Sequence, residues 1–143
     1  MEKEKQFTLS LVTWQQQEQA LREIRKQVFI QEQHVPETLE WDGLDEDCIH
    51  VLVLDGSGQA IATARMQNNG HIGRMAVLPN WRHRGIGSAM LHKLLAYCSQ
   101  HDLQAQLDAQ THALDFYRTM GFSTIGEEFL DAGIPHRKMI YME

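Results

Sequence analysis

Cysteine, proline and long apolar runs are scarce in this chain of 143 residues. Cys48 and Cys98 are too few and too far apart to form a disulfide framework or a cysteine metal site. No apolar run approaches the roughly 20 residues that a membrane-spanning helix needs, so we expect no membrane association. The histidines are scattered, without a His-x-x-x-His pair on any expected helix. We therefore expect no metal cofactor.

Basic residues are also in the minority. The chain has 13 Lys and Arg against 19 Asp and Glu, a formal net charge of −6, which argues against nucleic acid as the main partner. Four of the first five residues are charged and they form no apolar signal segment, which predicts a cytoplasmic location. The length suits one domain, and we expect residues 1–143 to form it.

Hydrophobic periodicity predicts a mixed α/β fold. Strands are expected at residues 6–12, 50–54, 60–66, 71–77, 103–107, 122–125 and 136–141, and helices at 15–29, 85–100 and from about 111 to 121. Turn signals after residues 54 and 67 make the second, third and fourth strands an antiparallel meander. Residues 31–47 read as an acidic loop with room for a short helical turn. This order predicts one mixed sheet with helices on its faces.

The most informative segment covers residues 74–91, where a strand and a turn lead through a glycine- and arginine-rich loop into a helix. The first turn of a helix has unpaired N–H groups and the positive end of the helix dipole. Gly85 and Gly87 let phosphate oxygens approach that backbone, and Arg82 and Arg84 add positive charge. The segment predicts a site for a phosphorylated ligand.

Two common phosphate motifs do not fit this loop. A P-loop is excluded because no lysine follows either glycine, and a dinucleotide fingerprint needs a third glycine where Met90 stands. What remains is Arg-x-x-Gly-x-Gly, spelled Arg82-His83-Arg84-Gly85-Ile86-Gly87, after a strand that ends Met75-Ala76-Val77. This pattern resembles the acyl-CoA-binding motif of the GNAT superfamily of N-acetyltransferases.

The resemblance extends along most of the chain. Downstream, Ala113-x-x-Phe116-Tyr117 and the following Gly121-Phe122 resemble the second signature of the family, a helix that closes at Gly-Phe. Upstream, residues 28–33 and the acidic loop after them resemble a subgroup of small bacterial members. The two signatures stand in the order and at the distance that the family shows.

The resemblance implies a single-domain GNAT-like fold, with a mixed, mostly antiparallel sheet, a splayed parallel strand pair (residues 71–77 and 103–107) and helices on both faces. It implies transfer of an acetyl group from acetyl-CoA to a primary amine of a small molecule or peptide, by direct attack on the thioester. A non-catalytic acyl-CoA-binding module is the alternative. Small members of the family often pair, which makes a homodimer compatible with the resemblance. The residues it implies for acetyl-CoA binding are Met75, Ala76, Val77, Arg82, His83, Arg84, Gly85, Ile86, Gly87, Ser88, Gln110 and Phe116.

Tyr117 matches the family tyrosine that protonates the departing thiolate. A phenol has a reference pKa of about 10, above a thiol at about 8.5, so it is a proton donor at neutral pH. The competing interpretation is an aromatic residue that packs beside Phe116.

The base that takes the proton of the amine is left open by the sequence. The candidates are Glu32, Glu40, Asp42, Asp45, His50 and Asp108. We choose Glu32 because it follows an apolar stretch and has a route to the acceptor cleft, and the competing interpretation is an ordinary exposed glutamate. Asp108 stands where relatives often have Asn, which leaves a structural role open.

The acidic loop offers two interpretations. Its carboxylates either recruit a cationic amine or form an ordinary solvated loop. The acids are Glu37, Glu40, Asp42, Asp45, Glu46 and Asp47. Arg65 and Arg74 lie on neighbouring strands, and either project into the cleft or line the wet face of the sheet.

Overall fold

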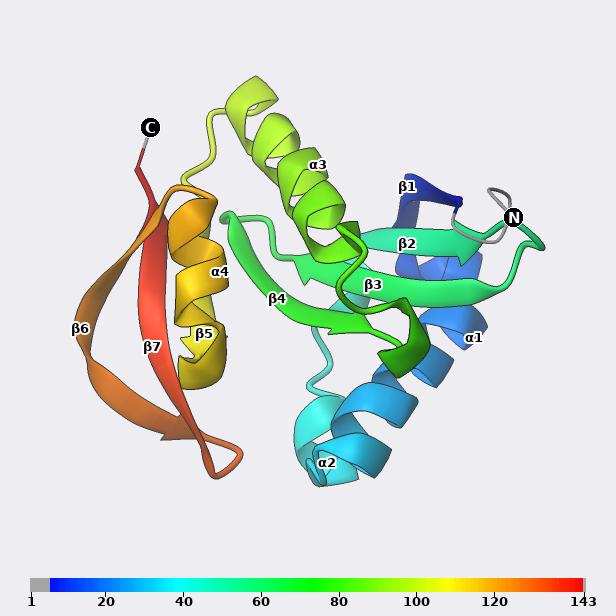
Figure 1. Cartoon of the computed structure of the whole chain (residues 1–143), viewed down its shortest axis with the longest axis horizontal. Coiled ribbons are helices and arrows are strands. Elements are labelled where there is room, and N and C mark those ends of the chain that lie inside the picture. The colour runs from blue at the N-terminus through cyan, green and yellow to red at the C-terminus, as the bar shows by residue number, and fades with distance from the viewer. Residues whose placement is uncertain (1–5, 143) are drawn as a thin grey trace.

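The computed structural model describes residues 6–142. Over these residues the strands form one seven-stranded sheet in the order β1-β2-β3-β4-β5-β7-β6 (Figure 1). The strands are β1 Phe7–Thr13, β2 Ile49–Asp55, β3 Ala60–Met66, β4 His71–Val77, β5 Gln106–Gln110, β6 Phe122–Asp131 and β7 Ile134–Tyr141. All neighbours are antiparallel except β4 and β5, which are parallel. The predicted mixed α/β fold, including the meander of β2, β3 and β4, is confirmed.

Helices cover both faces of the sheet (Figure 1). On one face lie α1 (Trp14–Arg25), its continuation as the π-helix η2 (Lys26–Glu32), and α2 (Glu37–Glu40). On the other face lie α3 (Ile86–Gln100) and α4 (Leu114–Thr119). Single turns of 3-10 helix complete the chain: η3 Asp45–Asp47, η4 Pro79–Trp81 and η5 Thr111–Ala113. Within residues 6–142, no helix has the length and apolar character needed to cross a membrane.

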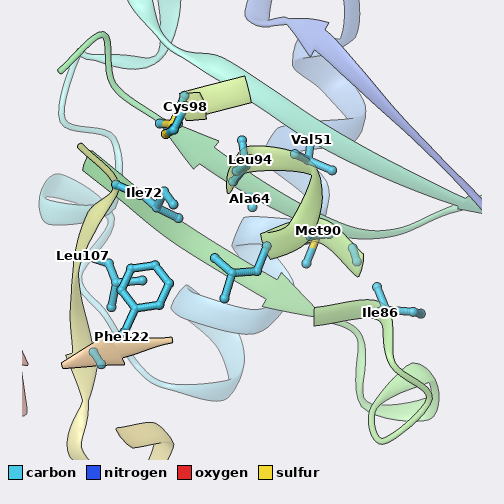
Figure 2. Packing of buried hydrophobic residues seen from close by; sticks show 14 of the residues in the cluster. Val51, Ala64, Ile72, Ile86, Met90, Leu94, Cys98, Leu107 and Phe122 are labelled. Atoms are coloured by element: carbon cyan, nitrogen blue, oxygen red, sulfur yellow. The ribbon is translucent and has the colours of Figure 1, made fainter. Parts of the chain in front are cut away.

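Each face of the sheet has its own hydrophobic core. The core under α3 and α4 contains Ile72 of β4 and Leu107 of β5, packed against the apolar face of α3 (Figure 2). Cys98 is 3% exposed and is a packing residue of this core. The core under α1 joins Leu52 and Ala76 of the sheet to the apolar face of α1 and η2. Full burial of one such large side chain stabilises the fold by about 1.5–3 kcal/mol.

The parallel strands β4 and β5 separate almost as soon as they pair. Their Cα register contains only His71↔Gln106 and Ile72↔Leu107, and no further pairs follow within the described chain. Beyond Ile72, the β4 edge that faces β5 therefore lacks a ladder partner from β5. The predicted splayed pair is confirmed, and it leaves backbone groups available between the two strands.

A bulge in β4 sets which side chains face each core. The register with β3 shifts between Thr63 and Arg65, and Arg74 has a left-handed φ of 50°. An extra residue on one strand moves every later side chain to the opposite face. As a result, Met75 packs with the core under α3, whereas Ala76 packs with the core under α1.

The start of α1 has a sequence-encoded cap. The Thr13 hydroxyl accepts from the Gln16 N–H at 3.2 Å, and the Gln16 side chain accepts from the Thr13 N–H at 3.0 Å. This capping box satisfies two backbone donors at the end of β1 and stops the strand there. The helix predicted at residues 15–29 is confirmed, but its last turns widen into a π-helix, in which the Gln33 N–H bonds to Val28 O at 3.1 Å.

The prediction for β5 was wrong by three residues. The Leu103 N–H bonds to Cys98 O at 2.9 Å, and Asp102 has a φ of 54°, so this segment closes α3. The strand instead covers residues 106–110, because β7 pairs with all five of them.

The last hairpin is longer than predicted. β6 continues past Ile125 to Asp131, and a two-residue turn with positive φ at Ala132 and Gly133 connects it to Ile134. Such a turn suits the right-handed twist of paired strands. This outer strand is exposed, and its residues Glu127 and Glu128 interrupt the apolar pattern. The pattern therefore predicted a strand that ended at residue 125.

Candidate functional site

The N-terminus of α3 has free backbone donors. Gly85 is the N-cap, with a left-handed φ of 82°, and no side chain in residues 6–142 caps this end. The first bond of the helix runs from the Ala89 N–H to Gly85 O at 3.0 Å. The N–H groups of Ile86, Gly87 and Ser88 therefore lack helical acceptors and can bind an anion. Because the Ile86 side chain is buried in the core, its contribution is limited to this backbone group.

Arg82 is already engaged beside this helix end. Its Nε donates to Val77 O at 2.9 Å, and its two terminal nitrogens donate to the carboxylate oxygens of Glu32 at 2.6 and 2.8 Å. The pair links η2 to the loop before α3. The Arg82 hydrogen bond lowers the pKa of Glu32.

The next two residues of the loop are exposed. The Arg84 guanidinium lies 4.8 Å from the centroid of the Trp81 ring, a cation–π contact. His83 has a left-handed φ of 63°. This backbone turn presents Arg82, His83 and Arg84 at the entrance to α3.

Tyr117 lies on the same face of the sheet as α3. Its hydroxyl is 3.4 Å from Met75 Sδ, and its ring meets Phe116 edge-on with centroids 5.0 Å apart. A Cβ added at Gly87 would lie 3.4 Å from the Phe116 ring, so Phe116 packs against the first turn of α3. Burial raises the pKa of Tyr117 to about 12, which keeps the phenol protonated at neutral pH.

Gln110 lies on the face of the sheet opposite to Tyr117. Its Nε2 donates to Oε1 of Gln33, just after η2, at 3.0 Å. The gap between β4 and β5 is thus bordered by Tyr117 on one face and by the end of η2 on the other. The structure brings together the predicted residues of β4, the glycine loop and α4, and places Gln110 across the gap from them.

The acidic loop is largely neutralised by arginines. Arg25 of α1 binds Glu40 and Asp45, Arg65 of β3 binds Asp42 and Asp45, and Arg74 of β4 binds Glu40 and Asp42. Three carboxylates therefore share three guanidiniums. The amine-recruiting interpretation is wrong for these three acids, and the solvated-loop interpretation is wrong for Glu40 and Asp45, which are buried. They hold the loop against the sheet.

Burial and pairing also remove several candidate bases. Glu40, Asp45 and His50 are 2%, 6% and 0% exposed, so an acceptor amine cannot reach them. Burial raises the pKa of Glu40 and lowers that of His50. Burial opposes the ionisation of Asp42, but the hydrogen bonds from Arg65 outweigh it and lower the pKa of Asp42 to about 2.

A polar pair stands where β4 and β5 separate. Nε2 of His71 and Oδ2 of Asp108 are 3.3 Å apart, and both side chains are partly exposed. The hydrogen bond with His71 lowers the pKa of Asp108. His71 was absent from the sequence candidates, because the misplaced boundary of β5 hid the fact that it shares a face with Asp108.

The model of the acetyltransferase (GNAT) domain matches residues 12–142. The chain belongs to the GNAT family of acetyltransferases. GNAT proteins bind acyl-CoA and transfer acyl groups to amines, so the family supports acyl transfer in general for this chain. The resemblance seen in the two signatures is confirmed.

Three relatives are similar along most of the chain. The uncharacterized N-acetyltransferase YjcF of Bacillus subtilis is 36% identical over 121 residues, which cover 82% of this chain and 86% of YjcF. The crystal structure of Escherichia coli ElaA superposes with a TM-score of 0.85 at 28% identity, covering 96% of this chain and 100% of ElaA. An acyl-CoA N-acyltransferase from Pseudomonas aeruginosa gives a TM-score of 0.83 at 28% identity, with the same coverage. The seven-stranded sheet with its splayed parallel pair is therefore the GNAT fold.

Proposed function

We propose that this protein transfers an acetyl group from acetyl-CoA to a primary amine of a small molecule or peptide. The observation that carries the proposal is the gap between β4 and β5, which has anion-binding N–H groups at one end and a protonated tyrosine beside it. A non-catalytic acyl-CoA-binding module would need the first feature but not the second.

The residues around the gap suit acetyl-CoA. The free N–H groups at residues 86–88 and the guanidiniums of Arg82 and Arg84 would hold the pyrophosphate. Backbone groups of Met75, Ala76 and Val77, along the unpaired edge of β4, would bind the pantetheine arm as an added strand. Phe116 and Gln110 would line its two sides. When bound there, acetyl-CoA supplies a thioester whose carbonyl carbon accepts the amine.

Tyr117 is proposed as the general acid. Its hydroxyl reaches the gap from the α3 face and would donate its proton to the sulfur as the carbon–sulfur bond breaks. Its raised pKa, about 12, favours the protonated phenol throughout the physiological range.

Glu32 as the base that takes the proton of the amine stays a prediction. Its lowered pKa makes it a weaker proton acceptor, and both of its oxygens are occupied by Arg82. It would act as a base only after pyrophosphate had taken Arg82 away from it. A cytoplasmic location and a homodimer also stay predictions.

The test is thiol release from acetyl-CoA with a panel of primary amines, run beside calorimetric titration with CoA. Acetyl-CoA-dependent thiol release that requires an amine supports the proposal. Tight CoA binding without thiol release across the panel would favour the binding module. No CoA binding by a folded protein would contradict both.

A further inference from the structure

We propose that Asp108 binds the ammonium group of the acceptor, which makes the preferred substrates aliphatic amines that are protonated at neutral pH. His71 positions the Asp108 carboxylate for this contact. The inference rests on the proposed function and adds the residue that selects the acceptor.

Asp108 stands at the vertex of the splayed strands. Leu107 is the last residue of β5 that pairs with β4, and Asp108 follows it directly. The reactive end of a pantetheine arm that enters from the pyrophosphate loop would reach this vertex. An ammonium group held there would lie next to the thioester carbonyl.

The side chain of Asp108 faces the side from which an acceptor can approach. Leu107 and Ala109 lie in the core under α3, so Asp108 and Gln110 point to the other face of the sheet. The contact of Gln110 with Gln33 confirms that this face looks toward η2. Because Tyr117 lies on the α3 face, the amine would attack from one side and the thiolate would meet its proton donor on the other.

Asp108 pairs with an imidazole, whereas the other carboxylates near this face pair with guanidinium groups. Glu32, Glu40, Asp42 and Asp45 each accept hydrogen bonds from an arginine, which cancels their charge. The partner of Asp108 is the imidazole of His71, whose own Nδ1 lies 3.4 Å from Nε2 of Gln67. The contact with His71 engages Oδ2 of Asp108, and the other carboxylate oxygen, Oδ1, has no hydrogen-bond partner within residues 6–142. The carboxylate therefore has lone pairs free for an ammonium group.

Two further titratable groups on this face come from β7. Lys138 is the cross-strand partner of Asp108, and His136 is the partner of Gln110. Cross-strand partners share a face, so the exposed Lys138 repels a cation bound to Asp108. No ion pair joins Lys138 to Asp108 within residues 6–142, so the carboxylate stays available.

The reaction then balances with the groups present. The ammonium bound to Asp108 releases one proton to solvent, and the neutral nitrogen forms a bond to the carbonyl carbon of the thioester. The carbon–sulfur bond breaks, the nitrogen loses a second proton, and the sulfur takes a proton from Tyr117, which solvent replaces. The products are an amide and CoA.

The experiment compares the wild type with Asp108→Asn and with the control Asp102→Asn, an exposed aspartate at the end of α3. Each protein is assayed with the fastest aliphatic amine of the panel, and the uncharged alcohol analogue of that amine serves as competitive inhibitor. For Asp108→Asn we expect KM to rise about 10- to 100-fold, the scale of a hydrogen bond to a charged group. The inhibition constant of the alcohol and the Kd for CoA should change less than about two-fold. For Asp102→Asn all three should be unchanged.

Two further variants separate charge from structure. His71→Gln should raise KM about three- to ten-fold without changing the Kd for CoA, because it loosens the carboxylate but leaves its charge. Lys138→Gln removes the repelling cation and should lower KM about two- to five-fold, with a smaller change in high salt. If Asp108→Asn does not fold, the decrease in the KM of Lys138→Gln becomes the deciding test of the role of Asp108.

The outcomes distinguish the two proposals. Thiol release by the wild type, with an unchanged KM in both Asp108→Asn and Lys138→Gln, would overturn the role of Asp108 and leave the acetyltransferase function standing. An equal loss of affinity for the amine and the alcohol would also overturn it, because charge recognition would not be involved. If the folded wild type releases no thiol with any amine, the proposed function fails and this inference fails with it.

Discussion

Glu32 and Arg82 form a bidentate ion pair that links the end of η2 to the loop before α3. One partner comes from the face on which the acceptor is proposed to bind and the other from the proposed pyrophosphate site. An anionic ligand at residues 82–88 would compete with Glu32 for the Arg82 guanidinium. Under the proposed function, cofactor binding would therefore change the partners of Glu32.

The first prediction concerns this ion pair. Glu32→Gln should bind CoA more tightly, by up to about five-fold, because Arg82 is freed and a negative charge beside the cofactor is removed. Calorimetric titration at low and high salt measures it, and the gain should shrink as salt rises. Glu18→Gln, on the exposed face of α1, is the matched control and should bind CoA as the wild type does. If Glu32→Gln instead slowed turnover by about 100-fold or more, that loss would support the role of Glu32 as a base.

The second prediction tests the general acid. Tyr117→Phe should slow turnover by about 100-fold or more and leave the Kd for CoA unchanged, because only the proton donor is lost. Tyr97→Phe is the control, since Tyr97 lies on α3 and stacks on His101. Because the pKa of Tyr117 is about 12, turnover by the wild type should not fall between about pH 7 and 10 through ionisation of this residue. Equal turnover of Tyr117→Phe and the wild type would remove the acid role.

The third prediction tests the helix entrance. Gly85 and Gly58 both have left-handed φ angles, 82° and 87°, and a Cβ at either would meet no atom within 4 Å. Valine at either position should cost about 1–2 kcal/mol of stability. Gly85→Val should also weaken CoA binding at least about ten-fold, because the side chain blocks the approach of phosphate to the helix end. Titration of the two variants separates strain from ligand exclusion, and equal CoA binding by both would contradict the loop assignment.

The fourth prediction concerns the buried ion network. Arg25→Met leaves Glu40 and Asp45 short of a partner in the interior, and should lower the free energy of unfolding by about 3–5 kcal/mol. Arg22→Met, on the same helix, breaks only a half-exposed pair with Glu18 and should cost about 1 kcal/mol or less. Urea unfolding measures both. Similar losses for the two variants would mean that the network adds little to stability.

The fifth prediction is a pH dependence. The folded pKa of Asp42, about 2, lies below its ordinary value of 3.8, so the stability that it contributes is present above about pH 4. It should be lost as the pH falls toward about 2. Because Asp42 is partly exposed, solvent screening reduces this contribution, so Asp42→Asn should be less stable than the wild type by about 1 kcal/mol at about pH 6, and the difference should vanish below about pH 2. Because the pKa of Glu40 is raised, its contribution to stability decreases as the pH rises, and it does so in both the wild type and Asp42→Asn. A difference that stayed constant with pH would contradict the ionisation of Asp42 as the cause.

Much of the fold could be predicted because its signals are local. Strands β3 and β4 were placed at their observed bounds by alternation and by the turn residues between them. The entrance to α3 at residues 82–87 was predicted because glycine spacing before a helix depends on backbone geometry that neighbouring residues set. The splayed pair came from the family resemblance, and the register of β4 with β5 confirmed it.

Other features depended on partners far along the chain. The bounds of β5 follow from its pairing with β7, about 30 residues later. The neutral state of the acidic loop follows from Arg25, Arg65 and Arg74, which come from three different elements. Nothing near Asp42 in the sequence indicates that Arg65 will lie 2.8 Å from it.

The sequence by itself determined the order of the elements, the glycine-rich entrance to α3 and the position of Tyr117 on its helix, because helix and strand periodicity, glycine spacing and local turns depend on short segments. The tertiary structure alone decided which carboxylates are free. It buried Glu40 and Asp45 against arginines, joined Glu32 to Arg82, and left Asp108 beside His71 at the vertex of β4 and β5. The physical reason is that the charge available to a ligand depends on the partners that folding brings within a few ångströms, and here those partners are distant in sequence.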